Sequence, residues 1–216
     1  MNIAIDGPAG AGKSTIAKRV AKNLGYVYVD TGAMYRAMAL FFIRKGVSAD
    51  DSDKIGTMCN DADITIEYRD GEQVVVLDGE NVNAFLRTEE VGNMASATSA
   101  NANVRKKLVE LQQALAAKTN VVMDGRDIGT VVLPNAEVKV YLTASSAVRA
   151  ERRYKELVAK GETPDIKKIE ADIIERDERD MNRENSPLKQ AEDATFLDSS
   201  YMTIDEVVKT IMDMTK

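Results

Sequence analysis

The sequence contains no histidine and one cysteine among its 216 residues. Without histidine, the chain has no imidazole for general acid–base catalysis, no histidine-based triad and no His-ligated metal site. Because Cys59 is the only cysteine, no disulfide can form within the chain, and nothing points to secretion. Any catalysis must therefore rest on lysine, arginine and carboxylates, with a metal ion held by oxygen atoms.

Long apolar segments and an excess of positive charge are also missing. The longest apolar run, residues 37–43, is far too short to span a bilayer, and residues 2–5 resemble a strand rather than a leader. The net charge of −6 argues against a broad nucleic-acid or membrane surface. With 44% hydrophobic residues, the chain can bury one full core with small inserted subdomains. We expect one compact cytoplasmic enzyme that is a monomer.

The segment DGPAGAGKST, residues 6–15, has the spacing glycine, four residues, glycine, lysine and a hydroxyl residue. The apolar stretch before it predicts a strand, and residues 13–24 predict an amphipathic helix capped by Gly25. In this arrangement backbone N–H groups and the helix N-terminus face phosphate oxygens, Lys13 reaches the β- and γ-phosphates, and Ser14 holds Mg²⁺. The residues expected to bind ATP here are Gly7, Pro8, Ala9, Gly10, Ala11, Gly12, Lys13, Ser14 and Thr15.

Strands and helices alternate along the chain, which predicts an α/β fold with a parallel sheet. Four further strands are expected at residues 26–30, 120–125, 137–144 and 195–200. Residues 63–82 break the alternation, because period-two apolar positions flank Asp70 and Gly71 and predict an inserted antiparallel hairpin.

Two helices carry clear local signals. One has an apolar stripe and is therefore expected to pack on the sheet. The stripe consists of Val104, Leu108, Leu111 and Leu115. The other is the last helix, which opens with TIDE at residues 203–206, a capping box.

Two segments end strands with polar residues, where ligands of parallel sheets bind. Thr31 and Gly32 follow one strand, and Arg36 then stands on an otherwise apolar helix, so it either faces a ligand or extends to solvent. The other segment places Asp124 at the end of an apolar strand, followed by Arg126 and Asp127. This is the Walker B form, whose carboxylate orients Mg²⁺ directly or through water.

The third charged segment lies near the C-terminus. On a helix, Arg176, Asp180 and Arg183 share one face. An upstream helix contains Arg152, which is expected to bind ATP, and a short loop joins the two. Two arginine-rich helices at about residues 148–184 resemble a lid that closes over phosphates. The alternative is a solvated face of salt bridges.

Several ordered motifs together resemble the bacterial cytidylate kinases over essentially the whole chain. They are GPAGAGKST, DTGAMYRA, NMAS followed by NVRKKL, MDGRDIGT and ERDERDMNR. The resemblance implies a P-loop kinase core with a five-stranded parallel sheet, and a helical lid. It also implies a small inserted antiparallel β subdomain for the nucleoside monophosphate, which we expect at about residues 60–85. The implied reaction transfers the γ-phosphoryl group of ATP, with Mg²⁺, to CMP or dCMP in pyrimidine metabolism.

The resemblance also implies roles for single residues. The monophosphate positions are Thr31, Arg36, Arg126, Arg176 and Arg183. The cytosine-reading positions are Ser96, Arg105 and Asp127, and Asp180 takes the ribose hydroxyls. Catalysis is assigned to Lys13, Arg126, Arg176 and Arg183. Glu89 and Ala102 depart from the family pattern, which has proline at these two expected helix starts.

Two other functions remain open at this point. A different P-loop kinase would phosphorylate UMP, AMP or a non-nucleotide alcohol, and a panel of acceptors would identify it. A P-loop switch or regulatory ATPase would signal through a partner and turn ATP over slowly without an acceptor. The sets of arginines favour phosphoryl transfer between small molecules.

Overall fold

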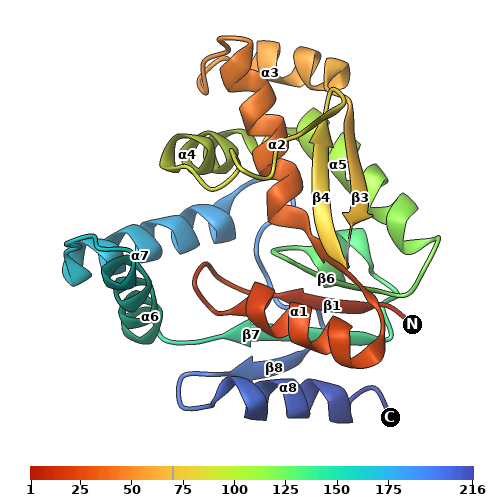
Figure 1. The fold of residues 1–216 in the computed structure, drawn as a ribbon, viewed down its shortest axis with the longest axis vertical. Coiled ribbons are helices and arrows are strands. Elements are labelled where there is room, and N and C mark those ends of the chain that lie inside the picture. The colour runs from red at the N-terminus through yellow and green to blue at the C-terminus, as the bar shows by residue number, and fades with distance from the viewer. Residues whose placement is uncertain (70) are drawn as a thin grey trace. The chain divides into compact units, whose positions relative to one another are not determined.

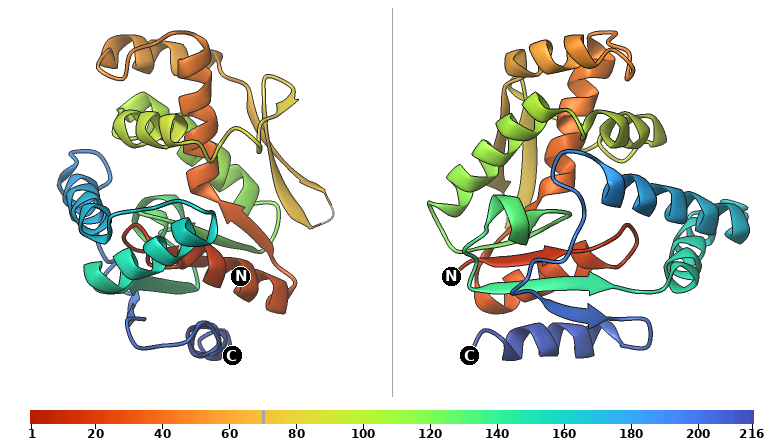
Figure 2. Two further views of the ribbon diagram at one scale, coloured as in Figure 1. Left: turned by 60° about the vertical axis from the view of Figure 1, so that its left-hand side comes forward. Right: turned by 180° about the vertical axis from the view of Figure 1, so that it is seen from behind.

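The computed structural model describes residues 1–69 and 71–216 (Figures 1 and 2). The chain divides into two compact units, one of Met1–Tyr28 with Asn120–Lys216 and one of Val29–Thr119. The first unit holds β1 (Ile3–Asp6), α1 (Lys13–Leu24), β6 (Val121–Gly125), the short π-helical segment η2 (Ile128–Val132), β7 (Val138–Thr143), α6 (Ser146–Ala159), α7 (Ile166–Asn182), β8 (Thr195–Asp198) and α8 (Ile204–Asp213). The boundary falls within β2 (Val27–Asp30).

A five-stranded sheet has the order β2-β6-β1-β7-β8. β1 pairs in parallel with both β6 and β7, and β7 pairs in parallel with β8. Each of the five expected strands is confirmed, with ends within two residues of the predicted ones. Because the strands are parallel, the segments that follow β1, β6 and β7 leave the sheet at the same edge.

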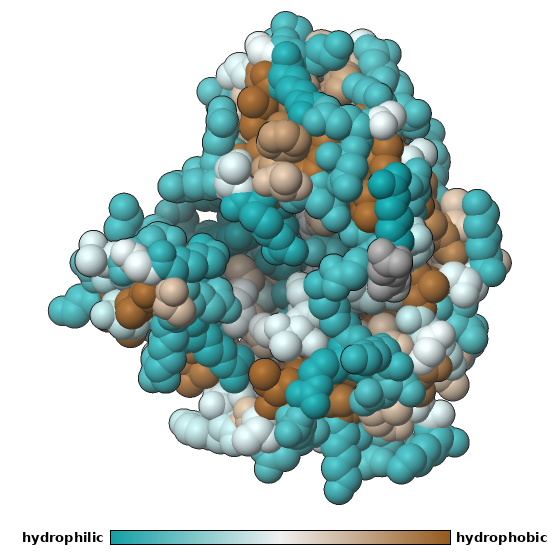
Figure 3. All heavy atoms as spheres, viewed as in Figure 1, coloured by the Kyte–Doolittle hydropathy of each residue, from teal (hydrophilic) through white to brown (hydrophobic). Residues whose placement is uncertain are grey.

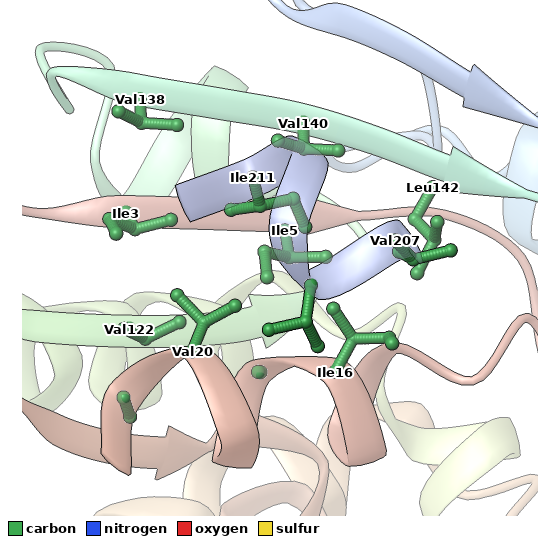
Figure 4. Packing of buried hydrophobic residues seen from close by; sticks show 13 residues of the cluster. Ile3, Ile5, Ile16, Val20, Val122, Val138, Val140, Leu142, Val207 and Ile211 are labelled. Atoms are coloured by element: carbon green, nitrogen blue, oxygen red, sulfur yellow. The ribbon is translucent and has the colours of Figure 1, made fainter. Parts of the chain in front are cut away.

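The helices α1 and α8 cover one face of this sheet (Figure 4). Ile16 and Val20 from α1, with Val207 and Ile211 from α8, lie among the aliphatic side chains of β1, β6 and β7. Full burial of one such side chain contributes about 1.5–3 kcal/mol. The apolar stripes of both helices therefore fix them to the sheet and hold the start of α1 at its carboxyl edge.

The predicted ends of both helices are confirmed. Gly25 follows α1 in the left-handed region with φ 68°, and its N–H group bonds to carbonyls of the last turn. At the start of α8, Thr203 and Glu206 form the reciprocal bonds of a capping box.

The second unit contains α2 (Thr31–Arg44), α3 (Ser52–Met58), the 3₁₀ turn η1 (Cys59–Asp61), β3 (Ile64–Arg69), β4 (Glu72–Leu77), β5 (Glu80–Asn81), α4 (Glu89–Thr98) and α5 (Ala102–Ala116). The predicted hairpin is confirmed, and the two-residue strand β5 extends it to a sheet of order β3-β4-β5. Asp70, the first residue of its expected turn, lies outside the described residues, whereas Gly71 has φ 79°.

The expected packing of α5 on the parallel sheet stays a prediction, whereas its packing within the second unit is described. Val104 and Leu108 are fully buried, but Leu111 and Leu115 are only half-buried. The main neighbours of α5 are the helices α2 and α3 and the turn η1, all in the second unit. Arg105 and Gln112 are buried on α5 as well, so apolar residues alone did not mark its packed face.

In the first unit, α6 and α7 pack against each other, as the two views of Figure 2 show. Residues 160–165 connect them. The face of the molecule in Figure 3 is mainly hydrophilic, with scattered apolar side chains. No helix in residues 1–69 and 71–216 is long and apolar enough to cross a membrane.

Candidate active site

The glycine loop between β1 and α1 has the backbone that its sequence predicts. Gly12, the residue before α1, lies in the left-handed region with φ 86° and leaves the helix N-terminus without a side-chain cap. A Cβ atom on Gly7 would lie 1.9 Å from the carbonyl oxygen of Leu142 on β7, so a side chain cannot fit there. The loop therefore packs closely on the sheet, and the N-terminus of α1 that follows it has no side-chain cap, which suits an anion.

Lys13 is a buried cation directly after this loop. Its side chain is 6% exposed, and Nζ donates to the carbonyl of Pro8 at 2.7 Å. Burial and the charge of Arg126 lower the pKa of Lys13 well below its usual value, and Arg176 acts in the same direction. Asp124 and Asp6 oppose this shift. Phosphate oxygens at this position would be strongly attracted to Lys13, because water does not screen its charge.

Ser14 and Asp124 meet at the predicted metal position. The hydroxyl of Ser14 donates to Asp124 Oδ2 at 2.9 Å, and the hydroxyl of Tyr28 donates to Asp124 Oδ1 at 2.8 Å. Asp124 is buried at the end of β6. Tyr28 was missed in the sequence, because a tyrosine inside a short apolar strand gives no sign of its partner. In the described residues no group of three or more carboxylates and thiols is placed to hold a metal alone.

A second charged cluster in the first unit surrounds Asp180 on α7. Arg126 Nε donates to Asp180 Oδ2 at 2.8 Å. Burial acts to raise the pKa of Asp180, but Arg126, Arg176 and Arg183 outweigh it and hold that pKa below its usual value. Arg183 also has Nη2 3.7 Å from Asp127 Oδ1. The structure therefore brings together five predicted substrate residues of this unit.

The alternative of a solvated salt-bridge face holds only for part of α7. Arg179, which pairs with Glu175 four residues earlier, is half exposed. Asp177 and Asp180 are buried on the other side of the same helix. The face with Asp180 is thus the functional candidate.

Arg152 on α6 lies beside the glycine loop. Its Nη1 is 3.5 Å from the carbonyl of Ala11, and Nη2 donates to the carbonyl of Ser199 at 2.8 Å. Ser199 follows β8, so Arg152 joins the loop after β1 to the loop after β8. This position is compatible with the predicted contact to ATP.

Asp6, the last residue of β1, was also missed. It accepts hydrogen bonds from the N–H groups of Ile128 and Gly129, each at 2.7 Å. Burial raises the pKa of Asp6 to about 6, the two hydrogen bonds lower it, the Asp127 charge raises it and Lys13 lowers it. This carboxylate thus fixes the segment that directly follows Asp127.

In the second unit, Thr31 and Arg36 stand at the start of α2. Thr31 is buried, and the N-cap residue Asp30 accepts from the N–H of Ala33 at 2.9 Å. A Cβ atom on Gly32 would lie 3.4 Å from Arg36 Nη1. The guanidinium of Arg36 therefore folds back over the N-terminal turn of α2, rather than extending to solvent, and adds its charge to the helix terminus.

In the same unit, Ser96 lies in the last turn of α4 and Arg105 in the first turn of α5. Arg105 is 4% exposed, Nη1 donates to the carbonyl of Ser99 at 3.1 Å, and its guanidinium lies 5.4 Å from the ring centre of Tyr35. Ser99 in turn donates to the carbonyl of Ser96. A buried guanidinium held by a carbonyl and an aromatic ring has a fixed direction, which suits recognition of a planar base.

Comparison with known proteins identifies the relatives of this chain. The family model described as cytidylate kinase matches residues 3–216. The cytidylate kinase of Caldicellulosiruptor bescii is 50% identical over 214 residues, covering 99% of this chain and 95% of the relative. That of Geobacter sp. (strain M21) is 50% identical over 208 residues, covering 96% and 89%.

Solved structures support the fold. TT1252 from Thermus thermophilus has a TM-score of 0.51 at 15% identity, covering 100% of this chain and 95% of that chain. An uncharacterized protein from Eubacterium ventriosum has a TM-score of 0.53 at 12% identity, covering 99% and 96%. At such low identity these structures bear on the fold alone. The match over residues 3–216 and the relatives at 50% identity, by contrast, show that the chain belongs to the cytidylate kinase family.

Proposed function

We propose that this protein transfers the γ-phosphoryl group of ATP to CMP or dCMP, which gives ADP and CDP or dCDP. The observation that carries the proposal lies in the first unit, where Arg126 and Arg176 are close enough to shift the pKa of the buried Lys13. These like charges repel each other, and Asp124 and Asp6 offset part of that repulsion. Two phosphate groups, one from the donor and one from the acceptor, would offset the rest.

The donor is bound by the glycine loop. Backbone N–H groups at the start of α1 hold the phosphates, and Lys13 neutralises the γ-phosphoryl group. Arg152, beside the loop after β8, also binds ATP. Ser14 and Asp124 fit Mg²⁺, because a hydroxyl and a carboxylate 2.9 Å apart are oxygen ligands of the kind it prefers. When bound, the metal would neutralise phosphate charge, with Asp124 acting directly or through water.

The acceptor residues are assigned from the motifs of the cytidylate kinase family. On this assignment the acceptor phosphate is bound by Thr31, Arg36, Arg126, Arg176 and Arg183. The base is read by Ser96, Arg105 and Asp127, and the ribose hydroxyls bond to Asp180. The β3-β4-β5 sheet then belongs to the monophosphate-binding part, and residues 148–184 form the lid.

No general base is needed for this reaction. A phosphate monoester has its second pKa near ~6 and is largely dianionic at pH 7, so its oxygen attacks without losing a proton. Catalysis then consists of positioning and charge neutralisation by Lys13 and the arginines, and closure of the lid excludes water. This mechanism agrees with a chain that has no histidine.

A panel of acceptors tests the proposal. ADP formation is measured with ATP and Mg²⁺ in the presence of CMP, dCMP, UMP, AMP, GMP or no acceptor. Fast turnover is expected only with CMP or dCMP. Equal or faster turnover with another acceptor would identify a different P-loop kinase. Rapid hydrolysis without an acceptor would contradict phosphoryl transfer and favour an ATPase.

A further inference from the structure

A buried ion pair joins the two helices of the lid region. Arg149 Nη1 on α6 lies 2.6 Å from Asp177 Oδ2 on α7, and their side chains are 7% and 9% exposed. Removing two charges from water costs several kcal/mol per ion, which their attraction offsets only with good geometry and further hydrogen bonds. The other ion pairs within these two helices, such as Arg153 with Glu156, are largely exposed. Arg149 and Asp177 differ from these pairs, because they are buried and join one helix to the other.

The further hydrogen bonds of this pair go to the glycine loop. Arg149 Nη1 donates to the carbonyl of Ala9 at 2.9 Å, and the N–H of Ala9 is directed at Asp177 Oδ1 at 3.4 Å. Arg149 Nε donates to the carbonyl of Ala144, directly after β7, at 2.8 Å. The pair thus binds both backbone polar groups of one loop residue and fixes them to the end of the sheet.

The next loop residue also contacts this arginine. A Cβ atom on Gly10 would lie 3.4 Å from Arg149 Cβ, so the loop backbone packs against the arginine side chain. Between residues 7 and 12 only Pro8, Ala9 and Ala11 have side chains, and none of the three is charged or forms a side-chain hydrogen bond. The direction of the loop's N–H groups must therefore be set from outside the loop.

We propose that Arg149 and Asp177 are positioning residues that hold the glycine loop in the geometry required for ATP phosphates. The inference rests on the proposed function, in which that loop binds the donor. Because Arg149 belongs to α6 and Asp177 to α7, a movement of these helices changes the conformation of the loop. By linkage, ligand binding at the loop changes the conformational equilibrium of the helices by the same coupling free energy. The lid and the donor site are thus coupled through these two side chains, which act by holding the loop backbone.

Asp177→Asn and Arg149→Lys test this inference. The first keeps shape and an acceptor for the N–H of Ala9 but removes the charge. The second keeps the charge but loses the planar fork that serves Ala9, Ala144 and Asp177 together. The matched control is Arg153→Lys on the same helix, which leaves the buried pair intact.

Affinities are measured by calorimetry for a non-hydrolysable ATP analogue with Mg²⁺ and, separately, for CMP. Each test variant should weaken binding of the ATP analogue by about 10-fold or more, as loss of a buried charge-assisted bond implies. CMP affinity should change less than about 2-fold, and the control should match the wild type for both ligands. A lower melting temperature with unchanged affinity for the ATP analogue would make the pair purely structural and overturn the inference. Equal losses for both ligands would overturn it as well.

Hydrogen exchange on the wild type keeps the inference testable if both variants unfold. Binding of the ATP analogue alone should slow amide exchange in α6 and in α7 as well as in the glycine loop. Protection confined to the loop would contradict the coupling. If the wild type binds the ATP analogue but not CMP, the proposed acceptor is wrong while the donor-side inference can still be judged.

Discussion

The hydroxyl of Ser14 donates to Asp124 Oδ2 at 2.9 Å, although the two residues are 110 positions apart. Ser14 lies in the first turn of α1 and Asp124 at the end of β6, the strand beside β1. The contact joins the start of α1, directly after the glycine loop, to the end of β6. Tyr28 bonds to the other carboxylate oxygen at 2.8 Å and fixes the orientation of Asp124.

Asp124→Asn should lower kcat by about 10–100-fold, because it weakens the oxygen ligands of the proposed Mg²⁺ site. The Mg²⁺ concentration for half-maximal activity should rise in parallel. Tyr28→Phe is the control, since it leaves the carboxylate charge in place, and it should cost less than Asp124→Asn. Steady-state rates across a Mg²⁺ titration check both, and an unchanged metal requirement in Asp124→Asn would exclude the assignment.

Lys13→Met should reduce kcat by about 100-fold or more, because one preorganised charge at the migrating phosphoryl group is lost. The fold should survive. Burial depresses the pKa of Lys13, so the charged side chain lowers the stability of the folded protein at neutral pH. The apolar methionine side chain has a similar length and removes that cost. We expect a melting temperature at or above that of the wild type. Near-normal turnover would show that the glycine loop is not the donor site.

Asp127→Asn should lower the ratio of kcat/KM for CMP over UMP by about 10-fold or more, since one base-edge contact is typically worth ~1–3 kcal/mol. An ionised carboxylate only accepts, so it suits the cytosine amino group and repels the uracil carbonyl. An asparagine amide can do either. If Asp127 serves only to pair with Arg183, 3.7 Å away, both substrates should lose equally. Measuring kcat/KM for both nucleotides separates the two roles.

The carboxyl of Asp6 should make stability depend on pH. Burial raises its pKa from 3.8 to about 6 in the folded chain, so the folded chain binds this proton more tightly than the unfolded chain does. The resulting gain in folding stability is fully present below pH 3.8 and is lost as pH rises through 6. Relative to Asp6→Asn, which does not titrate, the wild type should lose on the order of 2–3 kcal/mol between pH 4 and pH 7. Urea unfolding of both proteins across this range measures the difference. A constant difference would contradict the raised pKa.

Ala102→Pro should stabilise the protein by about 0.4–1 kcal/mol, because proline restricts the unfolded chain at a position that already suits it. Ala102 is the first residue of α5, and the preceding Asn101 is extended with φ −63° and ψ 126°, as a residue before proline must be. Glu110→Pro, at an exposed position in the middle of the same helix, is the opposite control and should cost ~3 kcal/mol or more. Thermal unfolding of both variants gives the comparison.

Local sequence determined the helices and strands and the backbone conformation of the glycine loop. The ends of α1 and α8 follow from Gly25 and from the Thr203 capping box, since cap residues satisfy backbone groups within a few positions. Glu89 and Ala102 stand at the first positions of α4 and α5, where the family pattern places helix starts. Such features depend on dihedral preferences and short-range hydrogen bonds, which neighbouring residues fix.

Tertiary structure decided which distant side chains meet. The packing of strands and helices places Tyr28 against Asp124, the backbone of residues 128 and 129 against Asp6, and the Arg149–Asp177 pair against Ala9. It also buried Arg105 and Gln112 on α5, which the apolar pattern did not mark. A periodic pattern reports that a face is buried but carries no information about what covers it. Partners more than a few residues apart depend on how strands and helices pack, and only the folded chain supplies that.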